Sequence, residues 1–278
     1  MTDRINEQNQ LVVLNPALTL RLGRIRHALF DFDGTISLLR QGWEGVMAPL
    51  MLEMISPDQP APVEIEQEVH AYIDQSTGML TIHQMEWLAQ AVRRYGLNAF
   101  PQSAAEYKAV YVRRIREIVR QRSAALRNGQ AEPSAVMLAG TVDFLERLPR
   151  RGLTLYLASG TDHADVVNEA RLLAMEAFFG GRIHGALDAS ETHDKQRLIE
   201  RILADNRLHG DELLVVGDGP VEIRVAVAQS AIALGVASDE VARSGWNPRK
   251  IERLTRAGAD ALVPDFSQAA ELEAFLFP

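Results

Sequence analysis

The chain has 278 residues, of which 47% are hydrophobic and 24% charged, a composition typical of globular proteins that excludes a disordered or fibrous chain. The formal net charge of −8 argues against general nucleic-acid binding, because that function needs a basic surface. Cysteine is absent, which excludes disulfides, zinc–thiolate sites and cysteine nucleophiles.

The N-terminal residues 1–10 are polar and mixed in charge, unlike a signal peptide. No apolar run along the chain approaches the length of a membrane span. We therefore expect a soluble cytoplasmic protein that has neither a membrane nor a nucleic acid as its partner. Nothing in the sequence indicates the oligomeric state.

Short apolar runs that end in polar or glycine residues recur along the chain. They are His27–Phe32, Leu153–Ala158, Leu213–Gly217, Ala231–Val236 and Ala261–Val263. Their length and flanking turn residues favour buried parallel strands, and helical patterns such as Lys195–Ala204 lie between them. The alternation predicts an α/β fold with a Rossmann-like parallel sheet, which binds ligands at the carboxyl ends of its strands.

The stretch 38–134 interrupts this alternation and reads as several helices without a convincing strand. We expect helices over 42–55, 63–73, 81–95 and 102–127, the third starting with a capping box of Thr81 and Gln84. Trp43 and Trp87 are interpreted as core residues of these helices. The predicted organisation is thus a catalytic α/β core of residues 1–37 and 135–278, with a helical cap of residues 38–134 inserted after the first strand.

The first strand ends in the segment Asp31-Phe32-Asp33-Gly34-Thr35. Two carboxylates so close together at the end of an apolar strand are unfavourable to bury unpaired, and a divalent cation removes that penalty. Asp31 can bind the metal through one oxygen and attack phosphorus with the other. Gly34 lets the chain turn, so that Asp33 can serve as acid and then as base.

Three further segments at strand ends can complete the same site. Ser159-Gly160-Thr161 offers a hydroxyl and backbone N–H groups that suit a phosphate, and we also expect it to cap the next helix. Lys195 begins a helix and can neutralise both phosphate and nucleophile; a solvated helix residue is the less favoured alternative. The turn after the third strand supplies Asp218 and Glu222, oxygen ligands of the kind that Mg²⁺ prefers.

The order DFDGT, SGT, a lone lysine and GDGPVE resembles the haloacid dehalogenase-like superfamily of aspartate-nucleophile phosphatases, in particular members similar to phosphoglycolate phosphatase and β-phosphoglucomutase. The resemblance implies Asp31 as nucleophile and Asp33 as acid and base. It also implies an inserted helical cap. The residues that would organise the phosphate are Thr35, Ser159, Gly160 and Lys195.

The resemblance further implies that Mg²⁺ is held by Asp31, the backbone carbonyl of Asp33, and Asp218. Here Glu222 stands where the superfamily commonly has a second aspartate. Because its side chain is longer, it can reach the metal directly or through a water molecule. We count Glu222 among the metal-binding residues and leave its exact role open.

Two residues beside the cap are candidates for substrate binding. Arg40 follows Thr35 closely, so we expect it to reach the mouth of the site and contact a second anionic group. Gly78 lies in a loop between two cap helices, where a glycine brings backbone close to a ligand or acts as a hinge. A loop without function is the alternative for Gly78.

The expected activity is Mg²⁺-dependent hydrolysis of a small phosphorylated metabolite, such as a sugar phosphate, through an aspartyl-phosphate. A phosphomutase or phosphotransferase would use the same residues with a hydroxyl acceptor in place of water. A phosphate-binding regulatory module without turnover is the alternative from another class of protein, although such a module has no need of the clustered acids.

Overall fold

A computed structural model describes residues 10–186 and 195–278. Its sheet has seven strands in the order β1-β7-β6-β5-β2-β3-β4, and among them only β1 runs antiparallel to its neighbour. The strands are β1 (Val12–Val13), β2 (His27–Asp31), β3 (Thr154–Asp162), β4 (Ile183–Ala186), β5 (Leu213–Gly217), β6 (Ile232–Val236) and β7 (Ala261–Val263). Within the described ranges, no helix combines the length and apolar character that a membrane crossing requires.

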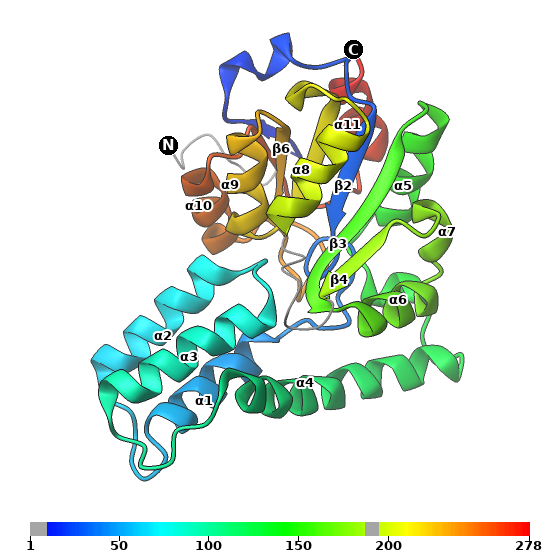
Figure 1. The fold of residues 1–278 in the computed structure, drawn as a ribbon. Helices are drawn as coiled ribbons and strands as arrows, with labels where there is room; N and C mark the ends of the chain where they lie inside the picture. Colours follow the sequence, from blue (N-terminus) through cyan, green and yellow to red (C-terminus); the bar gives the residue numbers. More distant parts are fainter. Residues whose placement is uncertain (1–9, 187–194) are drawn as a thin grey trace.

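Helices cover both faces of the sheet (Figure 1). One face packs against α5 (Thr141–Arg150), α6 (His163–Leu172), α7 (Glu176–Phe179) and α11 (Ala269–Leu276), and the other against α8 (Lys195–Asp205), α9 (Pro220–Ala228) and α10 (Pro248–Ala257). Because both faces are covered, every residue of β2, β5 and β6 is buried, which explains their continuous apolar sequences.

Four helices between β2 and α5 form a separate layer below the carboxyl ends of the strands (Figure 1). They are α1 (Glu44–Ile55), α2 (Val63–Ser76), α3 (Thr81–Tyr95) and α4 (Ala104–Arg127), and they share a hydrophobic core of their own. The predicted α/β fold with an inserted helical cap is therefore confirmed. The limits 1–37, 38–134 and 135–278 stay a prediction.

Two predictions about local structure at the site are wrong. β3 continues through Ser159, Gly160 and Thr161 to Asp162, so Asp162 is the N-cap of α6, without a side-chain hydrogen bond. The reason is that these residues remain extended beside β4, a strand whose short IHGA sequence gave no strand signal.

The predicted capping box at the start of α3 is also wrong. Leu80 is the N-cap and Thr81 the first helical residue, so the Thr81 hydroxyl caps nothing. Gln84 instead donates hydrogen bonds to the carbonyl and hydroxyl oxygens of Ser76. A genuine capping box begins α4, where the Ser103 hydroxyl accepts from the Glu106 N–H and the Glu106 carboxylate accepts from the Ser103 N–H.

Replacing Ser103 by alanine should destabilise the cap by about 1 kcal/mol, because the first turn of α4 loses its capping hydroxyl. Thr81→Ala is the matched control and should change the free energy of unfolding by less than about half that amount, since Thr81 makes no capping bond. Urea unfolding of both variants measures the difference. Equal losses in the two variants would contradict the assignment of the caps.

Candidate active site

The motifs meet because β2 lies between β3 and β5, with all three strands parallel. Their carboxyl ends therefore deliver Asp31, Ser159 and Asp218 to the same edge of the sheet. The turn after β2 requires glycine at position 34, whose φ is +80°, and a Cβ there would lie 2.6 Å from Asp218 Oδ2. The missing side chain thus lets the first and fourth motifs come into contact.

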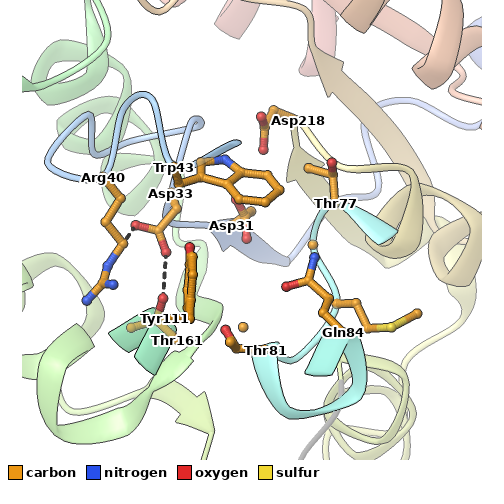
Figure 2. A pocket seen from close by; sticks show the side chains of 13 residues that line it. Asp31, Asp33, Arg40, Trp43, Thr77, Thr81, Gln84, Tyr111, Thr161 and Asp218 are labelled. Atoms are coloured by element: carbon orange, nitrogen blue, oxygen red, sulfur yellow. Dashed lines mark hydrogen bonds and ion pairs between the residues drawn. The ribbon is translucent and has the colours of Figure 1, made fainter. Parts of the chain in front are cut away.

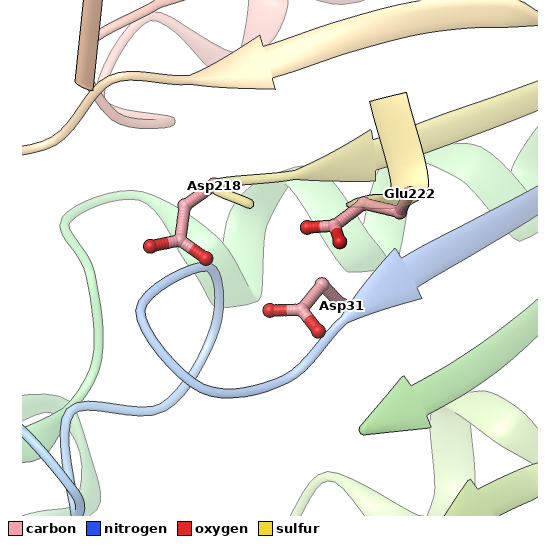
Figure 3. A group of neighbouring side chains, drawn as sticks. All are labelled: Asp31, Asp218 and Glu222. Atoms are coloured by element: carbon pink, nitrogen blue, oxygen red, sulfur yellow. The ribbon is translucent and has the colours of Figure 1, made fainter. Parts of the chain in front are cut away.

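Three buried acids, Asp31, Asp218 and Glu222, form the centre of the site. Each offers one oxygen, and these oxygens lie within 4.8 Å of one another. Figure 3 shows the three carboxyl groups turned towards a common space. Burial raises the pKa of Asp31 well above its ordinary value; Lys195 opposes this rise, and the charges of Glu222 and Asp218 add to it. The cluster is therefore electrostatically unfavourable without positive charge beside it.

Lys195 supplies part of that charge. It is 5% exposed, and its Nζ lies 2.6 Å from Asp31 Oδ1 and 2.9 Å from Glu222 Oε2. Burial alone would lower the pKa of Lys195, but Asp31 and Glu222 outweigh it and raise the pKa. The other oxygen of Glu222 accepts from the Gly219 N–H at 2.7 Å. Both oxygens of Glu222 therefore already have donors.

Asp218 has two cations of its own, both from α10. Lys250 Nζ lies 2.8 Å from Asp218 Oδ2, and Arg253 Nη2 lies 3.4 Å from the same atom. Arg253 also donates to the backbone carbonyl of Asp218. Burial would raise the pKa of Asp218, but Lys250 and Arg253 outweigh it, so the pKa is lowered. Asp218 is thus ionised and ready to act as a ligand.

The donor chemistry fits Mg²⁺ at Asp31 and Asp218. Among the described residues, Asp31 Oδ2 accepts a side-chain hydrogen bond only from the Thr35 hydroxyl, at 3.3 Å, and Asp218 Oδ1 accepts none. Each acid therefore keeps an oxygen for a hard cation. Glu222 fits direct ligation less well, because its two oxygens hold Lys195 and the Gly219 N–H.

Asp33 lies across the cavity from this cluster, and its two carboxylate oxygens have different surroundings. Its Oδ2 accepts from the Ser159 hydroxyl at 2.8 Å and from the Thr161 hydroxyl at 3.2 Å. Its Oδ1 is buried and has no hydrogen-bond partner. The Ser159 hydroxyl, expected from the sequence to face a phosphate, therefore fixes Asp33 in this structure, while the other Asp33 oxygen is directed towards Arg40 (Figure 2).

Arg40 does not lie at the mouth of the site, contrary to the prediction. It is 7% exposed, and its Nη2 lies 2.5 Å from Glu169 Oε1, while its Nε lies 3.7 Å from Asp33 Oδ1. The side chain turns inward because buried carboxylates on α6 and at the end of β2 attract it. Burial, followed by the Asp33 charge, raises the pKa of Glu169 to about 7 against the opposing pull of Arg40.

The loop between α2 and α3 lies directly on the core, and Gly78 faces the site as the sequence suggested. A Cβ at Gly78 (φ +89°) would lie 2.3 Å from Glu222 Oε2. From the core side, a Cβ at Gly160 would lie 2.4 Å from the Met79 carbonyl oxygen, and one at Gly219 would lie 2.7 Å from the Thr77 carbonyl oxygen. Glycine at these positions is what allows the cap loop to approach so closely.

Cap and core together line a cavity of about 60 Å³, shown in Figure 2. The core contributes Asp31, Asp33, Gly160, Thr161 and Asp218, and the cap side contributes Arg40, Trp43, Thr77, Gly78, Met79, Thr81, Gln84 and Tyr111. Trp43 was interpreted as a core residue of the cap; it packs against that core but also lines the cavity.

Several residues at or beside the cavity escaped the sequence analysis: Tyr111, Glu169, Lys250 and Arg253. They lie in the interior of α4, α6 and α10, where tyrosine and charged residues are common. No local motif marks them. For α10, the one available signal was an unusually one-sided arrangement of apolar residues, which did not show that Lys250 and Arg253 would be buried.

Comparisons with a protein-family model and with solved structures agree with this fold. A family model described as haloacid dehalogenase-like hydrolase matches residues 25–228. Among solved structures, a haloacid dehalogenase-like protein of unknown function from Agrobacterium tumefaciens is 18% identical (TM-score 0.58; 90% of this chain and 98% of that one covered). β-Phosphoglucomutase from Clostridium difficile is 12% identical, with a TM-score of 0.57 over 90% of this chain and 97% of that one. A predicted phosphoglycolate phosphatase from Haemophilus somnus is 13% identical, with a TM-score of 0.60 over 90% of this chain and 98% of that one. No curated protein matches the chain significantly.

Glu169→Gln should change the pH dependence of stability in a defined direction. In the folded protein the pKa of Glu169 is about 7 instead of 4.5, so the unfolded chain releases this proton first. The contribution of Glu169 is therefore complete below pH 4.5 and lost as pH rises through 7. Between pH 4 and pH 8, the wild type should lose about 3 kcal/mol relative to the variant. A pH-independent difference in urea unfolding would contradict this.

Proposed function

The chain belongs to the haloacid dehalogenase-like hydrolase family, and we propose that it is a Mg²⁺-dependent phosphohydrolase that acts on a small phosphorylated metabolite with Asp31 as its nucleophile. The observation that carries the proposal is the arrangement around the cavity. Asp31 lies in a buried acid cluster with Lys195, and Asp33, held by the hydroxyls of Ser159 and Thr161, lines the same cavity.

In the first step, an oxygen of Asp31 bonds to phosphorus while the bond from phosphorus to the leaving oxygen breaks. Asp33, which the hydroxyls of Ser159 and Thr161 hold in place, gives its proton to that oxygen. Lys195 favours the ionised form of Asp31 against the effect of burial and holds the carboxylate in place, and Thr35 supports the same carboxylate from its other side.

In the second step, Asp33 takes a proton from a water molecule whose oxygen attacks phosphorus. The bond to Asp31 breaks, and inorganic phosphate leaves with Asp33 protonated again for the next cycle. When bound at Asp31 and Asp218, Mg²⁺ would neutralise negative charge on the phosphoryl group. Glu222 holds Lys195 in position from the other side, which is a positioning role.

Phosphomutase or phosphotransferase activity is the second candidate, since a hydroxyl could replace water in the second step. One of the similar structures is a β-phosphoglucomutase, at 12% identity. A non-catalytic phosphate-binding module fits less well, because the three buried acids Asp31, Asp218 and Glu222 are electrostatically unfavourable and such a module has no need of them.

Asp31→Asn should lower the Mg²⁺-dependent turnover of acetyl phosphate by at least about a thousandfold, because the amide lacks the attacking oxygen. Asp58→Asn, in an exposed part of the cap, is the matched control and should keep wild-type activity. Acid quenching with labelled substrate should trap label on Asp31. Label on another residue, or full activity in excess chelator, would refute the mechanism; transfer of phosphate to an added alcohol in place of water would favour the second candidate.

Asp218→Asn and Glu222→Gln should affect different steps. Asp218→Asn removes a metal ligand and should raise the Mg²⁺ concentration for half-maximal activity at least about tenfold. Glu222→Gln should lower kcat because Lys195 loses an anchor, while the Mg²⁺ requirement stays within about threefold of the wild type. Titrating Mg²⁺ against activity separates them. An equal rise in both variants would make Glu222 a direct ligand.

A further inference from the structure

The cap wall of the cavity is built from uncharged hydrogen-bonding groups. Tyr111, Thr81 and Gln84 line the space opposite the acid cluster, with Trp43 as a flat apolar side. Figure 2 shows the polar ends of Tyr111, Thr81 and Gln84 directed into the same cavity. This wall faces the side of Asp33 on which a leaving group would lie.

The Tyr111 hydroxyl has no hydrogen-bond partner within the described part of the chain. The side chain is 6% exposed, and its hydroxyl makes no hydrogen bond with any described residue, although it lines the cavity. Burial raises the pKa of Tyr111, so the group is neutral and can both donate and accept. Because this hydroxyl lies at the cavity, it can donate to or accept from a ligand or water there.

Gln84 presents an acceptor whose orientation is fixed. Its Nε2 donates to the Ser76 carbonyl oxygen at 3.3 Å, and because a carbonyl can only accept, the amide nitrogen must lie on that side. The Oε1 atom therefore remains for the cavity, where it accepts from no described residue. Only a ligand that carries an O–H or N–H group can satisfy it; a carboxylate or a second phosphate cannot.

The charge around this wall also disfavours an anionic leaving group. Arg40 is the one cation among the described residues that line the cavity. Its guanidinium is already bound by both oxygens of Glu169 and lies beside Asp33. A second negative charge on a substrate would therefore meet Asp33 and Glu169 without a free cation to balance it.

The size of the cavity favours a small leaving group. A water molecule needs roughly 10–15 Å³ measured in this way, so a cavity of about 60 Å³ suits a small alcohol better than a large one. Gly78 and Gly160 set the limit from two sides, because backbone rather than a movable side chain closes the space there.

We propose that the substrate of this site is the phosphate ester of a small, uncharged alcohol with at least one further hydroxyl group, which donates to Gln84 Oε1 and bonds to the Tyr111 hydroxyl. This inference rests on the proposed function. It makes Tyr111 and Gln84 the residues that determine specificity, and the Arg40–Glu169 pair the feature that excludes carboxylated substrates.

Three esters of equal chain length test the proposal: glycerol 1-phosphate, n-propyl phosphate, which lacks the hydroxyls, and 3-phosphoglycerate, which carries a carboxylate. Phosphate release in the presence of Mg²⁺ gives kcat/KM for each. Glycerol 1-phosphate should exceed n-propyl phosphate by at least about tenfold and 3-phosphoglycerate by at least about a hundredfold.

Two variants locate the effect. Tyr111→Phe should lower kcat/KM for glycerol 1-phosphate about tenfold and leave n-propyl phosphate unchanged. Tyr107→Phe is the matched control: Tyr107 lies one turn earlier in α4, and its hydroxyl accepts from the Gln102 N–H outside the cavity, so the ratio between the esters should not change. Glu169→Gln releases Arg40 and should raise the relative rate for 3-phosphoglycerate at least about tenfold.

The opposite results would overturn the proposal. They are 3-phosphoglycerate turned over as fast as glycerol 1-phosphate, or an equal loss for all three esters in Tyr111→Phe. Acetyl phosphate, which offers no hydroxyl, separates this failure from failure of the proposed function. Hydrolysis of acetyl phosphate without turnover of any three-carbon ester would reject the leaving group alone, whereas no Mg²⁺-dependent hydrolysis of any compound would reject both.

Discussion

The site depends on the pairing of buried carboxylates with buried ammonium groups at the carboxyl ends of the central strands. Asp31, Asp218 and Glu222 would repel one another strongly in a space from which water is largely excluded. Lys195 lies between Asp31 and Glu222, and Lys250 balances Asp218. The acids that the chemistry needs can therefore be buried, because each has a cation from a helix that follows or neighbours its strand.

The same principle operates on the other side of the cavity with a different outcome. There Glu169 and Asp33 share a single guanidinium, that of Arg40, and acids outnumber cations. The site is thus asymmetric: on one side the charges are balanced, and in the proposed function this side would take the metal and the phosphoryl group. The other side is poor in positive charge and lined by neutral hydrogen-bonding groups. A phosphate ester of an uncharged alcohol has the same asymmetry.

The sequence predicted best those site residues that lie at or just after the carboxyl ends of strands. Asp31, Ser159 and Asp218 could be placed together because parallel strands deliver their carboxyl ends to one edge, and the apolar runs identified the strands. The position of Gly78 was also anticipated, as a glycine in a loop between helices. A helical cap followed from the long segment without strands.

Contacts between the cap and the core could not be predicted, because they depend on how two separately packed units meet. Arg40 was placed at the mouth on the basis of its distance along the chain, yet Glu169, more than a hundred residues later, draws it inside. Tyr111 had no mark in the sequence, and Gln84 was assigned to a capping box that does not exist. Glu222 looked like a ligand, and only the structure revealed its two hydrogen-bond partners.

The cap loop lies directly against Gly160 and Gly219, and this contact affects the strength of the electric field in the site. With the loop in place, the backbone at Gly78 covers Lys195 and Glu222, so little water can screen the ammonium. Coulomb interactions grow as the local dielectric constant falls. Withdrawal of the loop would admit water and weaken the attraction between Lys195 and any bound phosphoryl group. The contact between the cap loop and the core therefore has two effects: it restricts access to the site, and it strengthens the electrostatic interactions inside it.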